Sequence, residues 1–182
     1  KVITQNVDGL HRDSGVPSTQ LVEAHGVVGE FRCVLSASSS SSSSSSTSRE
    51  CEYRHVKSLA CAEAASVETV PRCPTCGTLM APLALLFDES YEDHERFDFA
   101  RAQAWLRSAT VLVFVGTSFA VTLTDMALRE ARDRHIPVFN FNTSAASLPR
   151  SWRASLPSVV TVEGPCEETL RDLVRFLPEK AN

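Results

Sequence analysis

The sequence predicts an α/β fold with a doubly wound parallel sheet and a small cysteine-rich module inserted into it. Strand-like apolar runs alternate with helical patterns after residue 82, which is typical of parallel strands joined by helices. The run V-L-V-F-V at residues 111–115 is continuously apolar, as expected for a strand buried on both faces. Cys73 and Cys76 form a C-x-x-C pair, a spacing typical of a metal-binding turn. With 182 residues, 43% of them hydrophobic, the chain can form an ordinary domain and this module.

The first part of the chain contains short elements that place polar residues at their ends. We expect a strand at residues 2–6, a helical turn at 10–14, an extended piece at 21–25 and a strand at 27–33. Residues 38–46 are an unbroken run of serines, which have no apolar side chains to bury. The sequence therefore predicts a disordered loop at 36–48, inserted into the cysteine-rich module.

Strands and helices alternate in the second part of the chain. The residues Phe99, Ala102, Leu106 and Ala109 are spaced as one face of a helix, and Leu170, Leu173, Val174 and Leu177 form a similar stripe that we expect to be buried. The expected elements are strands at 83–87, 111–115, 138–142 and 159–162 and helices at 123–134 and 166–176.

Charge and cysteine content limit the classes of function. The net charge of −4 and the isoelectric point of about 5.7 argue against direct binding of nucleic acid. No apolar run approaches the roughly 18 residues that a membrane span needs. Six cysteines, two of them in a C-x-x-C pair, favour metal binding in a reducing compartment over disulfides. We expect an intracellular location, in the nucleus or cytoplasm, with the mitochondrion left open.

Several separate motifs resemble one family. Residues 4–11 read T-Q-N-V-D-G-L-H and residues 23–26 read E-A-H-G, with Ser14 and Gly15 between them. In this order they resemble the sirtuin signature T-Q-N-[IV]-D-x-L-H, A-G and E-x-H-G, with a serine in place of the alanine. Residues 116–121 resemble the family's G-T-S-x-x-V, and residues 82–89 its P-x-V-V-x-F-G-E with Asp88 in place of glycine. The resemblance covers nearly the whole chain apart from the serine run.

The resemblance implies an NAD-dependent protein lysine deacylase. In that reaction the acyl-lysine carbonyl oxygen attacks the ribose carbon that bears nicotinamide, nicotinamide leaves, and the acyl group passes to ADP-ribose. His25 would be the general base on a ribose hydroxyl, since an imidazole with an ordinary pKa of about 6.5 suits that role. Asn6, together with Gln5 and Asp8, would hold the nicotinamide and its ribose. Without the motif, Asp8 would be interpreted as a turn or helix cap, and His11 is expected to be structural.

Further contacts with NAD are implied in the second part of the chain, at Gly116, Thr117, Ser118, Asn142 and Cys166. Thr117 and Ser118 can donate hydrogen bonds to phosphate or ribose oxygens, although Ser118 could equally be the N-cap of the next helix. Asn142 would face the adenosine ribose, with Asn140 as its rival. Cys166 would lie near the adenine, or else be a small buried residue at the start of a helix.

The cysteines predict a structural Zn²⁺ site. Cys73, Cys76 and Cys33 supply three ligands, and tetrahedral zinc needs a fourth. Cys51 is the preferred fourth ligand because C-E-Y at residues 51–53 resembles the family's C-G-Y, and Cys61 is the alternative. Four thiolates would leave no open position for water, so this ion would have no catalytic role.

These interpretations give a three-part organisation. Residues 1–32 would be a Rossmann-like part with the catalytic motif, 33–81 the zinc module, and 82–182 the second Rossmann-like part. The family places a Gly-Ala-Gly loop and a first βα unit before the strand at residues 2–6, so we expect an N-terminally truncated catalytic domain. Two alternatives are a zinc-stabilised binding module without turnover and a sirtuin-like protein ADP-ribosyltransferase. The sequence does not predict an oligomeric state.

Overall fold

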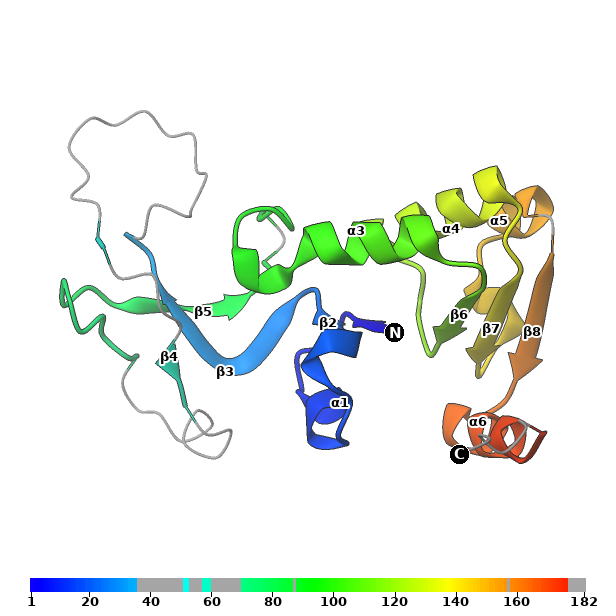
Figure 1. Cartoon of the computed structure of the whole chain (residues 1–182), viewed down its shortest axis with the longest axis horizontal. Helices are drawn as coiled ribbons and strands as arrows, with labels where there is room; N and C mark the ends of the chain where they lie inside the picture. Colours follow the sequence, from blue (N-terminus) through cyan, green and yellow to red (C-terminus); the bar gives the residue numbers. More distant parts are fainter. Residues whose placement is uncertain (36–50, 53–56, 60–69, 87, 157, 177–182) are drawn as a thin grey trace. The chain divides into compact units, whose positions relative to one another are not determined.

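The computed structural model describes residues 1–35, 51–52, 57–59, 70–86, 88–156 and 158–176. The chain divides into two compact units, Lys1–Ala104 and Trp105–Asn182. Figure 1 labels their helices and strands along the chain. The predicted serine loop at 36–48 and Cys61 lie outside the described residues. The division into 1–32, 33–81 and 82–182 stays a prediction.

The first unit begins with a parallel pair of strands. β1 (Val2–Thr4) lies beside β2 (Leu21–Glu23) in the register Val2 to Leu21. The connection between them contains α1 (Leu10–Asp13) and the 3₁₀ turn η1 (Ser18–Gln20). All three residues of β2 are buried, so this strand contributes most of the buried residues of the pair.

The second sheet of this unit is antiparallel and follows the order β4-β3-β5. β3 (Gly26–Cys33) pairs with β4 (Lys57–Ser58) on one side and with β5 (Met80–Ala84) on the other. The strand expected at 83–87 is therefore wrong by three residues. β5 lies at an edge of the sheet, where a proline is tolerated because its missing N–H is not required, so the strand runs through Pro82. Phe87 lies outside the described residues.

A 3₁₀ turn, η2 (Glu95–Phe97), and a helix, α3 (Phe99–Ser108), follow. Of the predicted stripe on α3, Ala102 and Leu106 are buried. This confirms the helical spacing on which the stripe was based.

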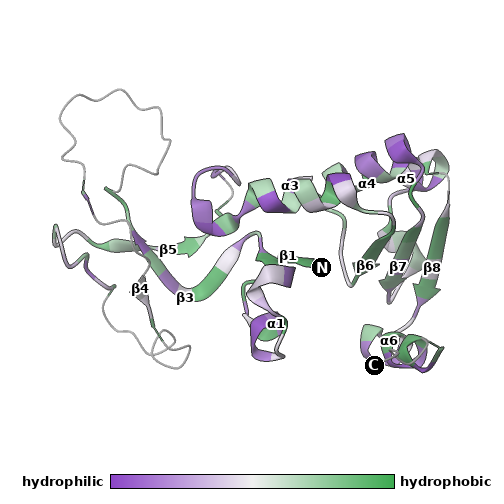
Figure 2. Ribbon diagram, in the orientation of Figure 1, coloured by the Kyte–Doolittle hydropathy of each residue, from purple (hydrophilic) through white to green (hydrophobic). Residues whose placement is uncertain are grey.

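The second unit contains a parallel sheet of three strands in sequential order. β6 (Leu112–Val115), β7 (Val138–Asn142) and β8 (Val159–Glu163) pair without a register shift. They alternate with α4 (Thr122–Arg134), η3 (Ala145–Ser147) with α5 (Arg150–Ser155), and α6 (Cys166–Phe176). In Figure 2 the three strands are mainly hydrophobic, while α4 and α5 show hydrophilic residues.

One face of this sheet forms the core of the second unit. The buried cluster consists of Leu128, Ala131, Ile136, Val138, Leu148 and Leu156. It joins α4 and the segment containing α5 to the strands, and Leu112 and Phe114 of β6 pack against it. The predicted α/β class, with parallel strands joined by helices and a cysteine module in the chain, is confirmed.

Two expectations about burial are wrong. β6 is not buried on both faces, because Val113 and Val115 are 52% and 47% exposed. β6 is an edge strand of its sheet, and among the described residues only the face with Leu112 and Phe114 packs on the core. Helix α6 likewise has no buried residue, and Val174 of the expected stripe is 64% exposed. Periodicity identifies an apolar helix face but not whether another element covers it.

Within the described residues, no helix combines the length and the apolar composition needed to cross a membrane.

Candidate functional site

His25 is placed by the sharp turn between β2 and β3. Gly26 has a φ of +78°, and a Cβ atom at this position would lie 2.0 Å from the carbonyl oxygen of Leu83. Only glycine fits so close to another backbone in this conformation. The N–H of Leu85 donates to the carbonyl of His25 at 3.0 Å, and Gly26 pairs with Ala84 of β5. The backbone of His25 and Gly26 is therefore held against β5 and the residue that follows it.

The imidazole of His25 is half-buried and has a partner on Nε2. The hydroxyl of Tyr91 lies 3.0 Å from this atom, and the two rings are 5.6 Å apart between centroids. Burial lowers the pKa of His25 below its ordinary value of 6.5, while a hydrogen bond to the backbone of Gln5 acts in the opposite direction. The structure therefore brings Gln5 and His25 together and favours the neutral imidazole, the form that can accept a proton.

Asn6 and Asp8 lie in the loop that follows β1. The backbone N–H of Asn6 donates to Oγ1 of Thr4 at 3.1 Å, and the side chain of Asn6 is exposed. Asp8 accepts from the N–H of Leu10 through Oδ1 at 3.0 Å, which is the turn-capping role that its position suggests in isolation. One oxygen of this exposed carboxylate makes that bond, and cofactor binding by Asn6 and Asp8 stays a prediction.

In the second unit, the predicted cofactor residues gather where the parallel strands end. The N–H of Gly116 donates to the carbonyl of Phe141 at 2.9 Å, and the side-chain amide of Asn142 donates to the carbonyl of Thr117 at 2.8 Å. The thiol of Cys166 donates to the same Phe141 carbonyl at 3.4 Å. Gly116, Thr117, Asn142 and Cys166 therefore form one cluster at the carboxyl edge of the sheet, where α/β folds bind ligands.

Two of the alternatives at this edge can be compared directly. Asn140 is fully buried, and its side-chain amide donates to Oγ of Ser147 at 3.3 Å. Asn142, which is also buried, ends β7 at that edge, and its role toward the ribose stays a prediction. The alternative role of Ser118 as an N-cap is wrong, because α4 begins at Thr122 and its N-cap is Val121.

The structure shows where Ser118 and Cys166 lie but does not decide their predicted roles toward NAD. Ser118 is exposed in the loop before α4. Cys166 is the first residue of α6 and is partly buried, which is compatible with either of its two predicted roles.

Four thiols of the first unit form a compact cluster. Their sulfur atoms all lie within 4.8 Å of one another, with Cys33 to Cys76 at 3.6 Å and Cys51 to Cys73 at 3.7 Å. In tetrahedral zinc sites the metal–sulfur distance of about 2.3 Å places neighbouring sulfurs about 3.8 Å apart. The thiols of these four residues therefore have both the chemistry and the spacing that Zn²⁺ requires.

The local fold explains the cluster. Cys33 ends β3, while Cys73 and Cys76 lie on a tight turn in which the N–H of Gly77, at a φ of +73°, donates to the carbonyl of Cys73 at 2.9 Å. Cys51 is held through its N–H, which donates to the carbonyl of Leu35 at 2.8 Å. The predicted alternative for the fourth position, Cys61, is not among the described residues.

The thiols of the cluster differ in acidity. Burial raises the pKa of Cys33 to about 12, whereas hydrogen bonds from Thr78 lower the pKa of the exposed Cys76 to about 6. A cation that binds all four sulfurs must therefore displace the proton of Cys33, and binding must depend on pH.

Sequence patterns did not reveal a network of ion pairs beside β2 and β3. Glu23 and Glu30 are buried, and the guanidinium of Arg96 bonds to Glu30 at 2.9 Å through two nitrogens and to Glu23 at 3.3 Å. Arg12 on α1 also pairs with Glu23. These partners lie far apart in the sequence, so no spacing rule could have connected them.

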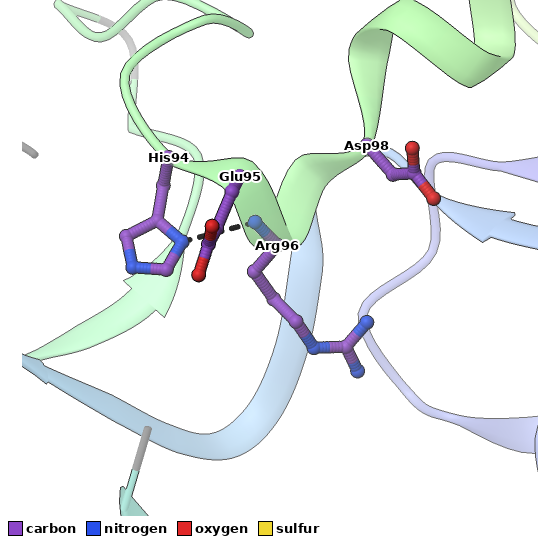
Figure 3. A pocket seen from close by; sticks show the side chains of 4 residues that line it. All are labelled: His94, Glu95, Arg96 and Asp98. Carbon is purple, nitrogen blue, oxygen red and sulfur yellow. Dashed lines mark hydrogen bonds between the residues drawn. The ribbon is translucent and has the colours of Figure 1, made fainter. Parts of the chain in front are cut away.

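Next to this network the surface is hollowed at η2. Figure 3 shows the side chains that line a hollow of about 370 Å³: His94, Glu95, Arg96 and Asp98. Nδ1 of His94 accepts from the backbone N–H of Arg96 at 3.1 Å and so caps the 3₁₀ turn. None of the predicted catalytic, cofactor or metal residues lines this hollow.

The arrangement of motifs, strands and cysteines agrees with a comparison against known families. A model of the Sir2 family matches residues 1–123. The chain belongs to the Sir2 family. The matched range includes His25, the four clustered cysteines and the G-T-S segment at 116–118.

Sir2 relatives with curated names are similar over most of the chain. The NAD-dependent deacetylase sir2E of Dictyostelium discoideum is 33% identical over 78% of this chain and 41% of its own length. An NAD-dependent protein deacetylase of Cutibacterium acnes is 32% identical over 76% of this chain and 47% of its own length. The chain spans about half the length of the curated relatives it matches.

Solved Sir2 structures have the same fold. A Sir2 homologue in complex with NAD gives a TM-score of 0.63 at 24% identity, over 95% of this chain and 56% of the homologue. A triple mutant of a Sir2 homologue with 2'-O-acetyl ADP ribose gives 0.69 at 22% identity, over 99% and 62%. At this level of identity the likeness shows the fold.

Proposed function

We propose that the protein is an NAD-dependent protein lysine deacylase, which transfers the acyl group of a modified lysine to ADP-ribose and releases nicotinamide. The observation that carries this proposal is His25, a half-buried imidazole with a lowered pKa, bonded to Gln5 of the intact T-Q-N-V-D-G-L-H motif. The curated relatives named deacetylase or deacylase support it.

His25 supplies the base. Its lowered pKa keeps the ring neutral at physiological pH, so a ring nitrogen can take the proton of a ribose hydroxyl. The hydrogen bond to the Gln5 backbone holds the ring in place. When bound, NAD would supply the ribose carbon that the acyl-lysine carbonyl oxygen attacks, with nicotinamide as the leaving group.

Two sets of residues would hold NAD. In the first unit, the side chains of Gln5, Asn6 and Asp8 offer the donors and acceptors that a primary carboxamide and a ribose require. In the second unit, Gly116, Thr117, Ser118, Asn142 and Cys166 offer backbone N–H groups, hydroxyls and an amide at the carboxyl ends of parallel strands. This donor set fits the sugar and phosphate groups of a dinucleotide.

The cysteine cluster would hold one structural Zn²⁺ through Cys33, Cys51, Cys73 and Cys76. The spacing of the sulfurs and the burial of three of the four residues support this. We infer that residues 33–81 form the zinc module between the two Rossmann-like parts, 1–32 and 82–182. Four thiolates would leave no open position on the ion, so it would stabilise the fold and leave the chemistry to His25.

The substrate would be an acyl-lysine protein or peptide inside the cell, in the nucleus or cytoplasm, with the mitochondrion left open. A solved Sir2 structure with a p53 peptide and NAD⁺ supports a peptide as ligand, and the net charge of −4 does not favour nucleic acid. The C-x-x-C pair among the six cysteines favours metal binding in a reducing compartment.

The test of this function is nicotinamide release in the presence and absence of an acetyl-lysine peptide, with NAD labelled in its adenylate group. We expect release that requires the peptide, with the label recovered as acyl-ADP-ribose. Peptide-independent release with label on protein would indicate an ADP-ribosyltransferase instead. Absence of NAD binding at full zinc content would indicate a binding module without turnover. Either of these results would overturn the proposal.

A further inference from the structure

Tyr91 belongs to none of the motifs, yet it contacts the proposed base. It lies in the loop between β5 and η2, 66 positions after His25 in the sequence. Its hydroxyl is 3.0 Å from Nε2 of His25, and both side chains are partly buried. A hydrogen bond at this distance is well formed, so it fixes the direction in which Nε2 points.

The position of the Tyr91 ring is fixed from two sides. Its phenol stacks on Phe99, the first residue of α3, with 4.9 Å between ring centroids and an angle of 13° between planes. The loop before it is anchored to β3 by the ion pair of Glu89 with Arg32, whose side chains are 15% and 12% exposed. These anchors place the hydroxyl without help from a ligand.

Tyr91 lies inside a compact turn that runs from Ser90 to Asp93. The N–H of Ser90 donates to Oδ2 of Asp93 at 2.7 Å, and the N–H of Asp93 donates to the carbonyl of Ser90 at 3.0 Å. Tyr91 and Glu92, the two residues between them, are therefore held in a closed turn, which favours a single position of the phenol.

The two hydrogen bonds of His25 are complementary. The bond to the Gln5 backbone favours the protonated ring, as expected when a ring N–H donates to a carbonyl. Because Nε2 faces the Tyr91 hydroxyl, we assign this N–H to Nδ1, which leaves the lone pair of the neutral ring on Nε2. The hydroxyl of Tyr91 can donate to that lone pair.

We propose that Tyr91 is a positioning residue for His25, whose hydroxyl holds the unprotonated Nε2 in place until a ligand hydroxyl replaces it. This inference rests on the proposed function, in which Nε2 accepts a proton from a ribose hydroxyl. The phenol hydroxyl lies in the direction from which the ribose hydroxyl would approach Nε2 of His25. The imidazole therefore does not have to reorient when NAD binds. Tyr91 itself exchanges no proton with the substrate.

The variant Tyr91→Phe tests the inference, since it removes the hydroxyl and keeps the ring that stacks on Phe99. Ser108→Ala, which removes an exposed hydroxyl at the other end of α3, is the control. In the ligand-free protein we expect the ¹⁵N resonance of His25 Nε2 to move downfield in Tyr91→Phe, as an unprotonated nitrogen does when it loses a donor. Ser108→Ala leaves this resonance unchanged.

Kinetics provide the second readout. We expect kcat to fall roughly tenfold in Tyr91→Phe while the KM for NAD changes by less than about twofold, as for other residues that orient a reactive group. Zinc content and melting temperature stay at wild-type values, which separates positioning from folding. Phe99→Leu, which keeps the hydroxyl but removes the stacking partner, gives a smaller loss of kcat.

The outcomes separate this inference from the proposed function. An unchanged Nε2 resonance, or a kcat in Tyr91→Phe equal to or above wild type, overturns the role of Tyr91 while deacylation stands. A shifted resonance in a protein that shows no deacylation supports the contact with His25 but refutes the proposed function, and with it the catalytic meaning of this contact.

Discussion

At the scale of single residues, some of the side chains around the proposed base, His25, can be recognised from the sequence and others cannot. The contiguous motifs E-A-H-G and C-x-x-C drew attention to His25, Cys73 and Cys76, while Cys51 followed from the resemblance of C-E-Y to the family's C-G-Y. Tyr91 could not be found in this way, since its contact with His25 depends on the folded path of the loop after β5. The role of Asp8 as a turn cap, in contrast, follows from its position directly before Gly9 and α1.

Replacing Gly26 by alanine should unfold the turn that places His25. The new Cβ would meet the Leu83 carbonyl oxygen at 2.0 Å, in a backbone conformation that itself costs about 1–2 kcal/mol for an L-residue. We expect the free energy of unfolding to fall by more than about 3 kcal/mol in a urea titration. Gly15→Ala is the matched control, because Gly15 has a φ of +88° but nothing within 4 Å of its Cβ position. Equal losses in the two variants would contradict the clash.

The pH dependence of kcat/KM should report the environment of His25. Burial lowers its pKa from 6.5, so the ring stays neutral to a lower pH than a free histidine, and the activity should be retained there too. We expect the midpoint of the acid limb to lie below pH 6.5. A midpoint above 6.5 would mean that another group controls the acid limb or that His25 is not the base.

Elements follow from the sequence where periodicity and breakers agree. The strand at 138–142 and the helix at 166–176 match β7 and α6, since both have clear apolar patterns between turn residues. Helix α5 and the 3₁₀ turns were missed because they are too short for a periodic pattern. The expectation that β6 and α6 are buried was wrong, because a single sequence does not reveal which face another element covers.

The ion-pair network beside β2 and β3 should stabilise the first unit. Arg96→Ala leaves Glu23 and Glu30 buried and paired with Arg12 alone among the described residues, so one carboxylate in the interior is left uncompensated. We expect a loss of about 2 kcal/mol in unfolding free energy, less than for a fully buried pair because Arg96 is about one-third exposed. Arg175→Ala, at the exposed pair with Asp172, should change stability by less than about 0.5 kcal/mol.

At the scale of the whole molecule, the chain consists of two units that contribute different parts of the proposed chemistry. The first contains the base and the cysteine cluster, and the second contains the strand ends that would bind the nucleotide. Family resemblance predicted both sets of residues. The sequence did not predict that the compact units would be Lys1–Ala104 and Trp105–Asn182, because contacts between distant segments decide this.

Metal removal should affect the two units differently. We expect one Zn²⁺ per chain, and a chelator should abolish hydrogen-exchange protection in β3 and β5 while β6 to β8 stay protected. Zinc affinity should fall as the pH is lowered, because burial holds the pKa of Cys33 at about 12 and metal binding must release its proton. Cys73→Ser should lose the metal and Cys166→Ser should retain it. Full zinc binding by Cys73→Ser would refute the assigned site.

The most direct test of the account is the rate of peptide-dependent nicotinamide release in His25→Asn compared with His135→Asn, the same substitution at an exposed histidine that ends α4. We predict that His25→Asn lowers the rate at least about a hundredfold, as expected for loss of a general base, and keeps its zinc. His135→Asn retains the wild-type rate. A wild-type rate in His25→Asn would contradict the assignment of His25 as the base.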